Sequence, residues 1–266
     1  MVIKLLAVDL DDTLLNEASV VSEANKKAIQ EAVARGVIVT IATGRMFESA
    51  QKIAKEIGLD VPLIAYNGAL VKSAISEEVL MEQCLDEEPA QAVLDLFREK
   101  GWYVQLYRGD KLYVDTVTDD TRDYENRIKT KAVAIGDALY TDPKNILKML
   151  AIADVDNLDF VEKTVQTIFQ GKIFAPRSRA RLLEIVNAKV NKGEALRFVA
   201  EHFGIKREEV MAIGDSNNDI AMLEYAGLGV AMDNASPRVK EVADVMTKSN
   251  EEDGVAEAIK AYILAE

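Results

Sequence analysis

The sequence has almost none of two residue types that often carry catalysis or bind metals. Among its 266 residues there is one cysteine, Cys84, and one histidine, His202. A lone cysteine cannot form a disulfide within the chain, and neither residue has a partner for a Cys/His zinc site. His202 falls in an apolar-periodic segment and is interpreted as a helix residue without a chemical role. These absences disfavour thiol and zinc chemistry and favour a reducing, cytoplasmic location.

Long apolar runs and an excess of basic charge are also missing. No stretch approaches the roughly 20 apolar residues that cross a membrane, and the apolar start before Asp9 is too short for a signal peptide. The 45 acidic residues outnumber the 32 basic ones, which gives a formal net charge of -13. Nucleic acids and anionic membranes bind basic faces, so we expect neither as a partner. A small phosphorylated metabolite is compatible with this charge, because one metal ion or lysine can supply positive charge locally.

What is present is the composition of a soluble globular protein, with 49% hydrophobic and 29% charged residues. The length suits one large or two moderate domains, and the sequence contains no internal repeat or low-complexity tract. No feature sets the oligomeric state, and we expect a monomer.

The chain is organised around its first predicted strand, residues 4–9, and the acidic turn that follows it. Asp9, Asp11 and Asp12 place three carboxylates within four positions. Like charges this close raise one another's pKa unless a cation or a charge-assisted hydrogen bond holds them ionised. Aspartate is also an ordinary turn residue, so a solvated acidic loop is the alternative interpretation.

Strands and helices alternate in the first part of the chain, as in parallel α/β proteins. After the first strand we predict helix 23–35 with Ser22 as its N-cap, strand 37–42, helix 46–57 and strand 63–66. The strand 37–42 leads into Thr43-Gly44-Arg45. Asp9 and Thr43 are therefore expected at the carboxyl ends of parallel strands, where open α/β sheets bind ligands.

From about residue 83 to about residue 186 the pattern changes to α+β, and the first pattern returns after that. The middle is predicted to contain helix 89–100, a hairpin of strands 102–107 and 112–115, strand 145–152, helix 158–169, and strands 172–175 and 182–186. The last part is predicted to alternate helices 191–203, 216–226, 237–243 and 255–264 with strands 209–213, 228–231 and 244–247. The simplest topology is an α/β domain, 1–82 plus 187–266, interrupted by an α+β domain, 83–186. A continuous two-domain split is the alternative, and it would separate the chain's two acidic clusters.

The second acidic cluster, Gly214 to Asp219, again follows a predicted strand. Asp215, Asp219 and the two amides between them supply the oxygen ligands that a hard divalent cation prefers, and Mg2+ is the default ion. The alternative is a polar strand-to-helix turn with Asp215 or Asn217 as the helix cap. Lys192 stands at a predicted helix start, where a lysine by itself is usually a solvated surface charge.

Four segments together resemble the motifs of the haloacid dehalogenase (HAD) superfamily of phosphatases, and within it the Cof-type sugar-phosphatase branch with a large type IIB cap. The similar segments are Asp9 to Leu15, Thr43-Gly44-Arg45, Lys192 and Gly214 to Asp219, in that order and with a gap for the cap after the second. Tyr66-Asn67-Gly68-Ala69 and Ala231 to Ala235 are similar to segments typical of the branch. The resemblance covers nearly the whole chain and implies a parallel-sheet, Rossmann-like core with an inserted α+β cap.

The sequence departs from the family pattern in two places. Asp12 stands where many relatives carry glycine. The approach to Lys192, residues 185–191, lacks the proline and the serine or threonine that commonly precede the lysine. Lys189 is the nearby competitor, and it lacks the following glycine.

The resemblance implies a hydrolysis in two steps. Asp9 would attack phosphorus to form an aspartyl phosphate, and Asp11 would be the general acid for the leaving group and then the base for water. Mg2+ would be held by Asp9, the Asp11 backbone carbonyl and Asp215, with Asp219 supporting from outside. The groups implied to bind the phosphate oxygens are the Thr43 hydroxyl, the Gly44 and Leu10 amides, Lys192 and Asn218.

The implied function is a Mg2+-dependent phosphohydrolase of small phosphorylated metabolites, such as sugar phosphates or the cofactors flavin mononucleotide and pyridoxal phosphate. Candidates for leaving-group contacts in the cap are Trp102, Tyr103, Gln105, Tyr107, Arg108 and Arg177, with ordinary packing or surface charge as the alternative for each. A phosphotransferase or mutase on the same scaffold and a non-catalytic phospho-metabolite-binding protein are competing functions. A signalling receiver domain is disfavoured, because its phosphorylated aspartate follows a later strand than its acidic pair.

Overall fold

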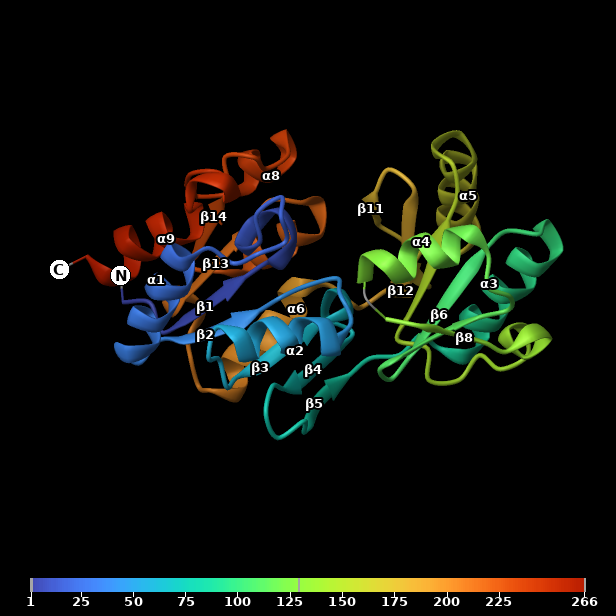
Figure 1. Ribbon diagram of the computed structural model, residues 1–266, viewed down its shortest axis with the longest axis horizontal. Helices are drawn as coiled ribbons and strands as arrows, with labels where there is room; N and C mark the ends of the chain where they lie inside the picture. Colours follow the sequence, from blue (N-terminus) through green and yellow to red (C-terminus); the bar gives the residue numbers. More distant parts are fainter. Residues whose placement is uncertain (1, 129, 266) are drawn as a thin grey trace. The chain divides into compact units, whose positions relative to one another are not determined.

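The structure is a computed structural model that describes residues 2–128 and 130–265. The chain separates into two compact units, Met1–Met81 with Asn191–Glu266, and Glu82–Val190 (Figure 1). The first unit is thus made from both ends of the chain and the second from its middle. The assignment of these units as catalytic core and cap remains a prediction.

The first unit is built on a parallel sheet in the order β15-β14-β13-β1-β2. The strands are β1 (Leu5–Val8), β2 (Ile38–Ile41), β13 (Val210–Gly214), β14 (Leu228–Ala231) and β15 (Val245–Met246). Val8 lies opposite Ile213 on one side and Ile41 on the other. β1 and β13 are buried along their whole length, as expected for strands of a parallel sheet that is covered on both faces. The predicted α/β class with a parallel sheet is confirmed.

The chain continues from β2 into an antiparallel sheet in the order β3-β4-β5. Its strands are β3 (Pro62–Ala65), β4 (Leu70–Ser73) and β5 (Val79–Glu82), of which the sequence analysis predicted the first alone. β3 lies beside the end of β2, where Ala42 pairs with Ile64 and the Thr40 hydroxyl donates to the Pro62 carbonyl at 2.6 Å. β3 ends one residue before the predicted strand, because Tyr66 adopts a left-handed conformation.

The helices of the first unit are α1 (Glu23–Ala34), α2 (Phe47–Glu56), α6 (Lys192–His202), α7 (Ile220–Tyr225), α8 (Pro237–Val242) and α9 (Gly254–Ile259). Ser22 caps α1 as predicted, since its hydroxyl accepts a hydrogen bond from the Asn25 amide at 3.1 Å. α1 packs against α9, and α6 packs against α7. The predicted helix 216–226 starts late, at Ile220, because residues 217–219 form a tighter turn.

The second unit has a mostly antiparallel sheet in the order β10-β12-β9-β6-β7-β8, with β11 beside β12. Its strands are β6 (Val104–Arg108), β7 (Lys111–Val114), β8 (Ala132–Ala134), β9 (Lys148–Ile152), β10 (Ile173–Phe174), β11 (Arg177–Arg179) and β12 (Leu182–Asn187), and its helices are α3 (Glu87–Lys100), α4 (Asp119–Ile128) and α5 (Val155–Ile168). The predicted hairpin is present as β6 and β7. The predicted strand 145–152 starts late, at Lys148. The sequence analysis missed α4, because its segment is almost wholly polar.

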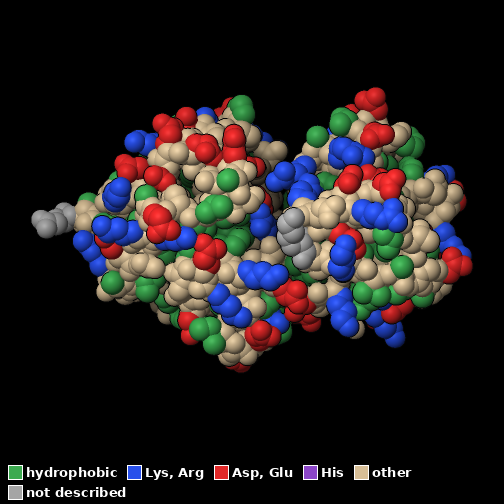
Figure 2. Space-filling model, viewed as in Figure 1, with side chains coloured by type: hydrophobic (Ala, Val, Ile, Leu, Met, Phe, Trp, Pro, Cys, Tyr) green, Lys and Arg blue, Asp and Glu red, His purple; other side chains and the backbone are tan. Residues whose placement is uncertain are grey.

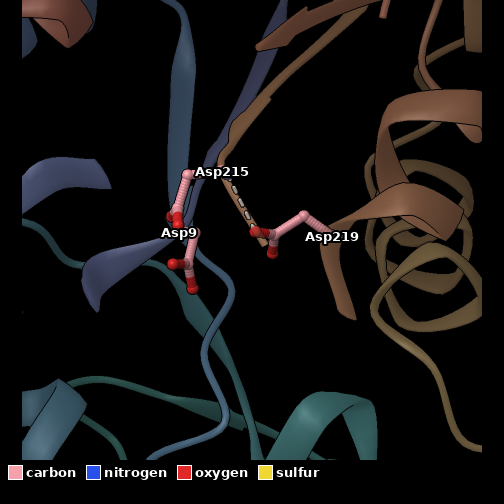
Figure 3. Close-up of side chains that lie close together, drawn as sticks. All are labelled: Asp9, Asp215 and Asp219. Atoms are coloured by element: carbon pink, nitrogen blue, oxygen red, sulfur yellow. Dashed lines mark hydrogen bonds between the residues drawn. The ribbon is translucent and has the colours of Figure 1, made fainter. Parts of the chain in front are cut away.

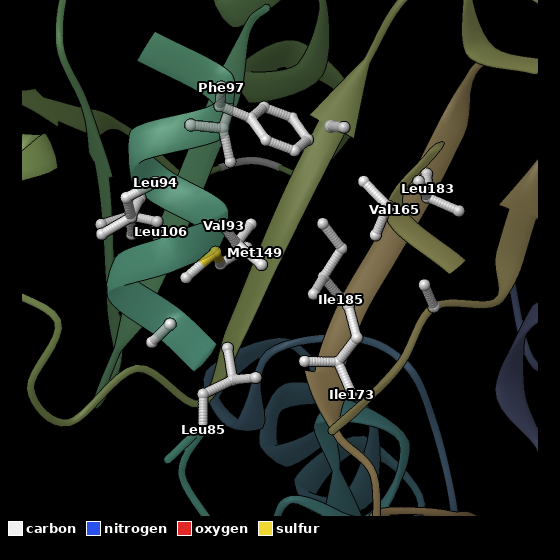
Figure 4. Close-up of a cluster of buried hydrophobic side chains, with 14 of the residues drawn as sticks. Leu85, Val93, Leu94, Phe97, Leu106, Met149, Val165, Ile173, Leu183 and Ile185 are labelled. Atoms are coloured by element: carbon white, nitrogen blue, oxygen red, sulfur yellow. The ribbon is translucent and has the colours of Figure 1, made fainter. Parts of the chain in front are cut away.

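α3 and α5 pack on one face of this sheet and close its hydrophobic core (Figure 4). Val93 and Phe97 of α3 meet Met149 of β9 and Ile185 of β12 in this core. Because side chains alternate along a strand, Lys148, the neighbour of Met149 on β9, lies on the opposite face.

On the face shown in Figure 2, Lys and Arg side chains are interspersed with Asp and Glu side chains. Acidic groups there have basic neighbours, although the whole chain carries a formal net charge of -13. Within residues 2–128 and 130–265, no helix has the length and apolar character to span a membrane.

Candidate active site

Two aspartates meet at the carboxyl edge of the parallel sheet. Asp9 directly follows β1, Asp215 directly follows β13, and these two strands pair in register. The Asp9 amide donates to the Ile213 carbonyl at 3.0 Å, which extends the pairing to Asp9 itself. Asp219, from the turn after β13, faces the other two aspartates (Figure 3). The three side chains are buried, and one carboxylate oxygen of each lies within 4.8 Å of the others.

Lys192 enters this group from the start of α6. Asn191 caps the helix by accepting a hydrogen bond from the Glu194 amide at 2.8 Å. The Lys192 ammonium donates to Asp9 Oδ1 at 2.5 Å and to Asp219 Oδ1 at 2.6 Å. The lysine side chain is fully buried. The interpretation of Lys192 as a solvated surface charge is therefore wrong.

The group holds more negative than positive charge, with three buried carboxylates around one buried ammonium. Burial raises the pKa of Asp9 well above its ordinary value; Lys192 opposes this rise and the neighbouring carboxylates add to it. Burial, followed by the charge of Asp219, raises the pKa of Asp215 to about 6. Burial acts to lower the pKa of Lys192, but Asp219 and Asp9 outweigh it and raise that pKa above its ordinary value. A divalent cation would offset the excess negative charge.

Two hydroxyls and two backbone amides fix the orientation of Asp215 and Asp219. The Thr13 hydroxyl donates to Asp215 Oδ1 at 2.6 Å, and the Ser216 hydroxyl donates to Asp215 Oδ2 at 2.7 Å. Asp219 Oδ2 accepts from the amides of Asp215 and Ser216 at 3.0 and 2.9 Å. The turn needs glycine at Gly214, because a Cβ there would lie 2.6 Å from Asp219 Cβ. One oxygen of Asp219 is thus held by the lysine and the other by the loop.

Asp11 lies on the same turn as Asp9, but its side chain is directed to Arg45. Its carboxylate, 37% exposed, accepts hydrogen bonds from Arg45 Nη2 at 2.6 Å and Arg45 Nε at 2.9 Å. The next residue, Asp12, has a φ of 59°, a left-handed conformation that glycine adopts readily and aspartate tolerates. The conformation of Asp12 is therefore compatible with aspartate at a position where the family resemblance predicts glycine. The bidentate contact of Arg45 with Asp11 was not predicted, although the arginine in Thr43-Gly44-Arg45 was a sequence signal for it.

The predicted phosphate-binding residues belong to loops and a helix start at the same edge of the sheet: Leu10 after β1, Thr43 and Gly44 after β2, Asn218 after β13, and Lys192 at the start of α6. Thr43 is buried, and its hydroxyl accepts a hydrogen bond from the Arg45 amide at 3.1 Å. Asn218 Nδ2 donates to Asn67 Oδ1 at 2.9 Å. Asn67 joins the site through this bond, although the sequence analysis gave it no role.

The candidate residues for leaving-group contacts make contacts inside the second unit. Trp102 lies edge-on to Phe97 and Phe160, with ring centroids 5.4 and 5.9 Å apart, which is ordinary packing. Arg177 pairs with Asp159 and Glu162 at 2.6 and 2.8 Å. The other candidates contact polar neighbours: Tyr103 with Thr121, Gln105 with Tyr103, Tyr107 with Tyr124, and Arg108 with Asp142. Their role in leaving-group contacts stays a prediction.

Comparison with known proteins gives a family and a set of relatives. The sequence profile of the family described as haloacid dehalogenase-like hydrolase matches residues 6–259. The 5-amino-6-(5-phospho-D-ribitylamino)uracil phosphatase YwtE of Bacillus subtilis (strain 168) is 32% identical to this chain over 278 residues. The match covers 95% of this chain and 96% of that protein.

Solved structures are similar along both units. A haloacid dehalogenase-like hydrolase from Bacteroides thetaiotaomicron gives a TM-score of 0.88 at 32% identity, covering 97% of this chain and 99% of that one. The HAD subclass IIB sugar phosphatase BT4131 gives a TM-score of 0.85 at 26% identity, covering 97% and 98%.

Proposed function

Because the chain belongs to the haloacid dehalogenase-like hydrolase family and is a phosphatase of that family, we propose that it hydrolyses small phosphorylated metabolites with Mg2+ and an aspartyl-phosphate intermediate. The resemblance predicted from the four motifs is confirmed at the level of the family. The observation that carries the proposal is Asp9, a buried carboxylate at the carboxyl end of β1 that Lys192 binds and Asp215 adjoins. The role given to each residue is part of the proposal.

The residues at the sheet edge fit a divalent cation. Asp9, Asp215 and Asp219 offer oxygen donors of the kind that Mg2+ prefers, and their combined charge exceeds that of Lys192. We propose Asp9, Asp215 and the Asp11 backbone carbonyl as ligands. Asp219 would support them, because Lys192 and loop amides already bind its two oxygens. When bound, Mg2+ would lower the repulsion between Asp9 and the phosphate and offset charge on the transferring phosphoryl group.

In the first step Asp9 is the nucleophile. A carboxylate oxygen of Asp9 attacks phosphorus, the bond from phosphorus to the leaving-group oxygen breaks, and the Asp11 carboxyl gives its proton to that oxygen. Lys192 fixes the Asp9 carboxylate through its hydrogen bond and adds positive charge beside the phosphate. The groups that hold the phosphate oxygens are the Thr43 hydroxyl, the Leu10 and Gly44 amides, Lys192 and Asn218.

In the second step water replaces the aspartyl group. Asp11, now a carboxylate, takes a proton from a water molecule whose oxygen attacks phosphorus. The bond from phosphorus to Asp9 breaks, which gives inorganic phosphate and restores the Asp9 carboxylate. In the structure Arg45 holds the Asp11 carboxylate through two hydrogen bonds, one to each oxygen. One of these oxygens has to leave Arg45 to carry the proton in the first step and to take a proton from water in the second.

The substrate class is inferred from the relatives. YwtE is named for a compound with a phosphoribityl group, and BT4131 is titled a sugar phosphatase. Sugar phosphates and phosphorylated cofactors both carry a phosphate on a small organic group, and we propose them as substrates of this chain. A cytoplasmic location and a monomeric state are further parts of the proposal.

The test is phosphate release from a panel of such metabolites, with and without Mg2+, by the parent protein, Asp9→Asn and Asp12→Asn. Asp12 is an exposed residue of the same turn with a left-handed φ. Asparagine also tolerates this φ, so Asp12→Asn is the matched control. Release that needs both Mg2+ and Asp9, and that survives in Asp12→Asn, supports the hydrolase. Transfer of phosphate to a sugar hydroxyl would favour the phosphotransferase. Binding without turnover would favour the non-catalytic binding protein.

A further inference from the structure

A turn of three residues, Tyr66–Gly68, has an unusual backbone. Its φ angles are 52° at Tyr66, 59° at Asn67 and 103° at Gly68. Glycine adopts such left-handed angles readily and asparagine tolerates them, but for a bulky tyrosine they are strained. Tyr66 and Asn67 are also buried, with 0% and 2% of their surface exposed. A strained, buried turn persists only where surrounding contacts hold it, so those contacts indicate what the turn serves.

The backbone of the turn holds the loop after β2. The Tyr66 amide donates to the Arg45 carbonyl at 3.0 Å, and the Asn67 amide donates to the Thr43 carbonyl at 3.0 Å. From the loop side, the Thr43 amide donates to the Ile64 carbonyl at 2.8 Å. These backbone hydrogen bonds tie a loop with two proposed phosphate-binding residues to the end of β3.

The Asn67 side chain connects this loop to the loop after β13. Its Oδ1 accepts a hydrogen bond from Asn218 Nδ2 at 2.9 Å. The same oxygen lies against Gly44, where an added Cβ would be 3.0 Å away from it. One carboxamide therefore lies between two groups proposed to bind phosphate, the Gly44 backbone and the Asn218 side chain.

Gly68 completes the turn by packing against the start of α6. A Cβ at Gly68 would lie 2.5 Å from the Asn191 carbonyl oxygen, so no side chain fits there unless that carbonyl moves. Asn191 is the N-cap of α6 and directly precedes Lys192. The turn thus touches, within the first unit, the loop after β2, the loop after β13 and the helix start that presents the lysine.

We propose that the Tyr66–Gly68 turn is a positioning element of the phosphate site and that Asn67 is its positioning residue. Asn67 acts through Asn218 and Gly44, by setting the spacing between their loops, and does not itself contact substrate. The inference rests on the proposed function, because that function gives Asn218 and Gly44 their phosphate contacts. The competing explanation is that position 67 requires asparagine for its left-handed backbone alone.

Asn67→Gly separates these explanations, because glycine keeps the left-handed backbone and removes the carboxamide. Asn145→Gly is the matched control, since Asn145 also has a left-handed φ, 55°, but is exposed and lies in the second unit. Binding of inorganic phosphate, measured by calorimetry with Mg2+ present, gives a readout that needs no turnover. We expect the affinity for phosphate to fall about 10- to 100-fold in Asn67→Gly, as when a group that orients a ligand-binding residue is lost. Asn145→Gly should bind phosphate as the parent protein does.

Kinetics supply a second readout. In Asn67→Gly, kcat/KM should fall by a similar factor for substrates with different leaving groups, because the defect lies at the phosphate they share. The double variant with Asn218→Ala should lose less than the sum of the two single losses, because Asn67 acts partly through Asn218.

Parent-like phosphate binding by Asn67→Gly, or fully additive losses in the double variant, would overturn the inference. The hydrolase function would still stand if the parent protein shows release that depends on Mg2+ and Asp9. Failure of Asn67→Gly to fold would also overturn the inference, because the carboxamide would then be needed for folding. If the parent protein neither binds nor releases phosphate, the proposed function fails and the inference fails with it.

Discussion

Among residues 2–128 and 130–265, two lysines are buried, one in each unit, and their electrostatic surroundings differ. Lys192, at the start of α6, donates to Asp9 and Asp219 at 2.5 and 2.6 Å, and Asp215 lies beside them. Lys148, on β9, lies 3.4 Å from Glu184 on β12. Both ammonium groups are buried beside carboxylates, and the one of Lys192 stands in a cluster of three aspartates.

We interpret this difference as one between a structural contact and the proposed active site. Moving charges out of water costs free energy, so burying an ion pair is not by itself stabilising. The ion pair of Lys148 and Glu184 joins adjacent strands, with the Tyr107 ring centroid 4.8 Å from the ammonium. The group around Lys192 has three carboxylates for one ammonium, an arrangement that folding alone does not favour and that the proposed cation would complete. We therefore regard this excess of buried carboxylates as support for the proposed active site at the carboxyl edge of the sheet.

The largest expected effect is on catalysis, from Lys192→Met. The substitution keeps an apolar stem in place and removes the ammonium beside Asp9. Phosphate release should fall about 100- to 1,000-fold, the range for loss of a preorganised group at the reacting centre. Lys189→Met changes a nearby exposed lysine and should release phosphate as the parent protein does. Near-parent release by folded Lys192→Met would remove the contrast between the two buried lysines.

Lys148→Met should act on stability more than on rate. It leaves Glu184 buried beside an uncharged side chain, and breaking one side of a buried ion pair costs about 3–5 kcal/mol. Urea unfolding should show this loss in the free energy of unfolding. Phosphate release per folded molecule should change much less than in Lys192→Met.

A second substitution sharpens this prediction. Adding Glu184→Leu to Lys148→Met should recover most of the lost stability, because a buried ion pair can often be replaced by apolar residues of similar volume. A double variant less stable than Lys148→Met would show that the pair is more than a structural contact.

The proposed catalytic residues are marked by local features of the sequence, and the structure brings Asp9, Asp215 and Lys192 together as expected from those features. Their catalytic roles stay a prediction. An apolar strand followed by an acidic turn locates both Asp9 and Asp215, and the glycine after Lys192 distinguishes it from Lys189. The rule that parallel strands present their carboxyl ends at one edge then brings Asp9 and Asp215 together.

Contacts set by strand register or by backbone conformation could not be predicted. Lys148 and Glu184 lie close because β9 pairs with β12, and no local sequence pattern predicts that pairing. The hydrogen bond from Asn218 to Asn67 depends on a left-handed turn. Left-handed backbone costs free energy in residues other than glycine, so the backbone preferences of Tyr66 and Asn67 do not predict this turn. α4 lacks an apolar stripe wide enough to be recognised, so tertiary contacts decide its conformation.

Mg2+ should stabilise the protein through the Lys192 group and not through the Lys148 pair. At 100 times its Kd the ion should add about 2.7 kcal/mol to the free energy of unfolding. The shift should shrink in Asp215→Asn, which loses a proposed ligand, and persist in Lys148→Met. Thermal unfolding of the parent protein and of both variants, each with EDTA and with Mg2+, measures this stabilisation. An equal stabilisation of all three proteins would show that the ion binds elsewhere.

The Mg2+ effect should also depend on pH, because protons compete for Asp215. The pKa of Asp215 in the folded protein, about 6, lies above the ordinary value of 3.8, so the folded metal-free protein binds this proton more tightly than the unfolded chain. Protonation of Asp215 therefore stabilises the metal-free folded protein at low pH, and this stabilisation is lost as the pH rises through about 6. Mg2+ needs the carboxylate form, so a fixed Mg2+ concentration should stabilise the protein more at pH 7 than at pH 5. Equal stabilisation at both pH values would show that proton and cation do not compete there.

The smallest effect is expected at a lysine whose ion pair is shorter than that of Lys148. Lys260 lies 2.9 Å from Glu257, but their side chains are 57% and 40% exposed. Solvent screens such a pair and pairing costs both side chains rotamer freedom, so many exposed pairs contribute nothing measurable. Lys260→Met should therefore leave both the urea midpoint and phosphate release within experimental error of the parent protein. If Lys260→Met instead lost as much stability as Lys148→Met, the distance between the charges, rather than their burial, would set the cost of removing a lysine from this chain.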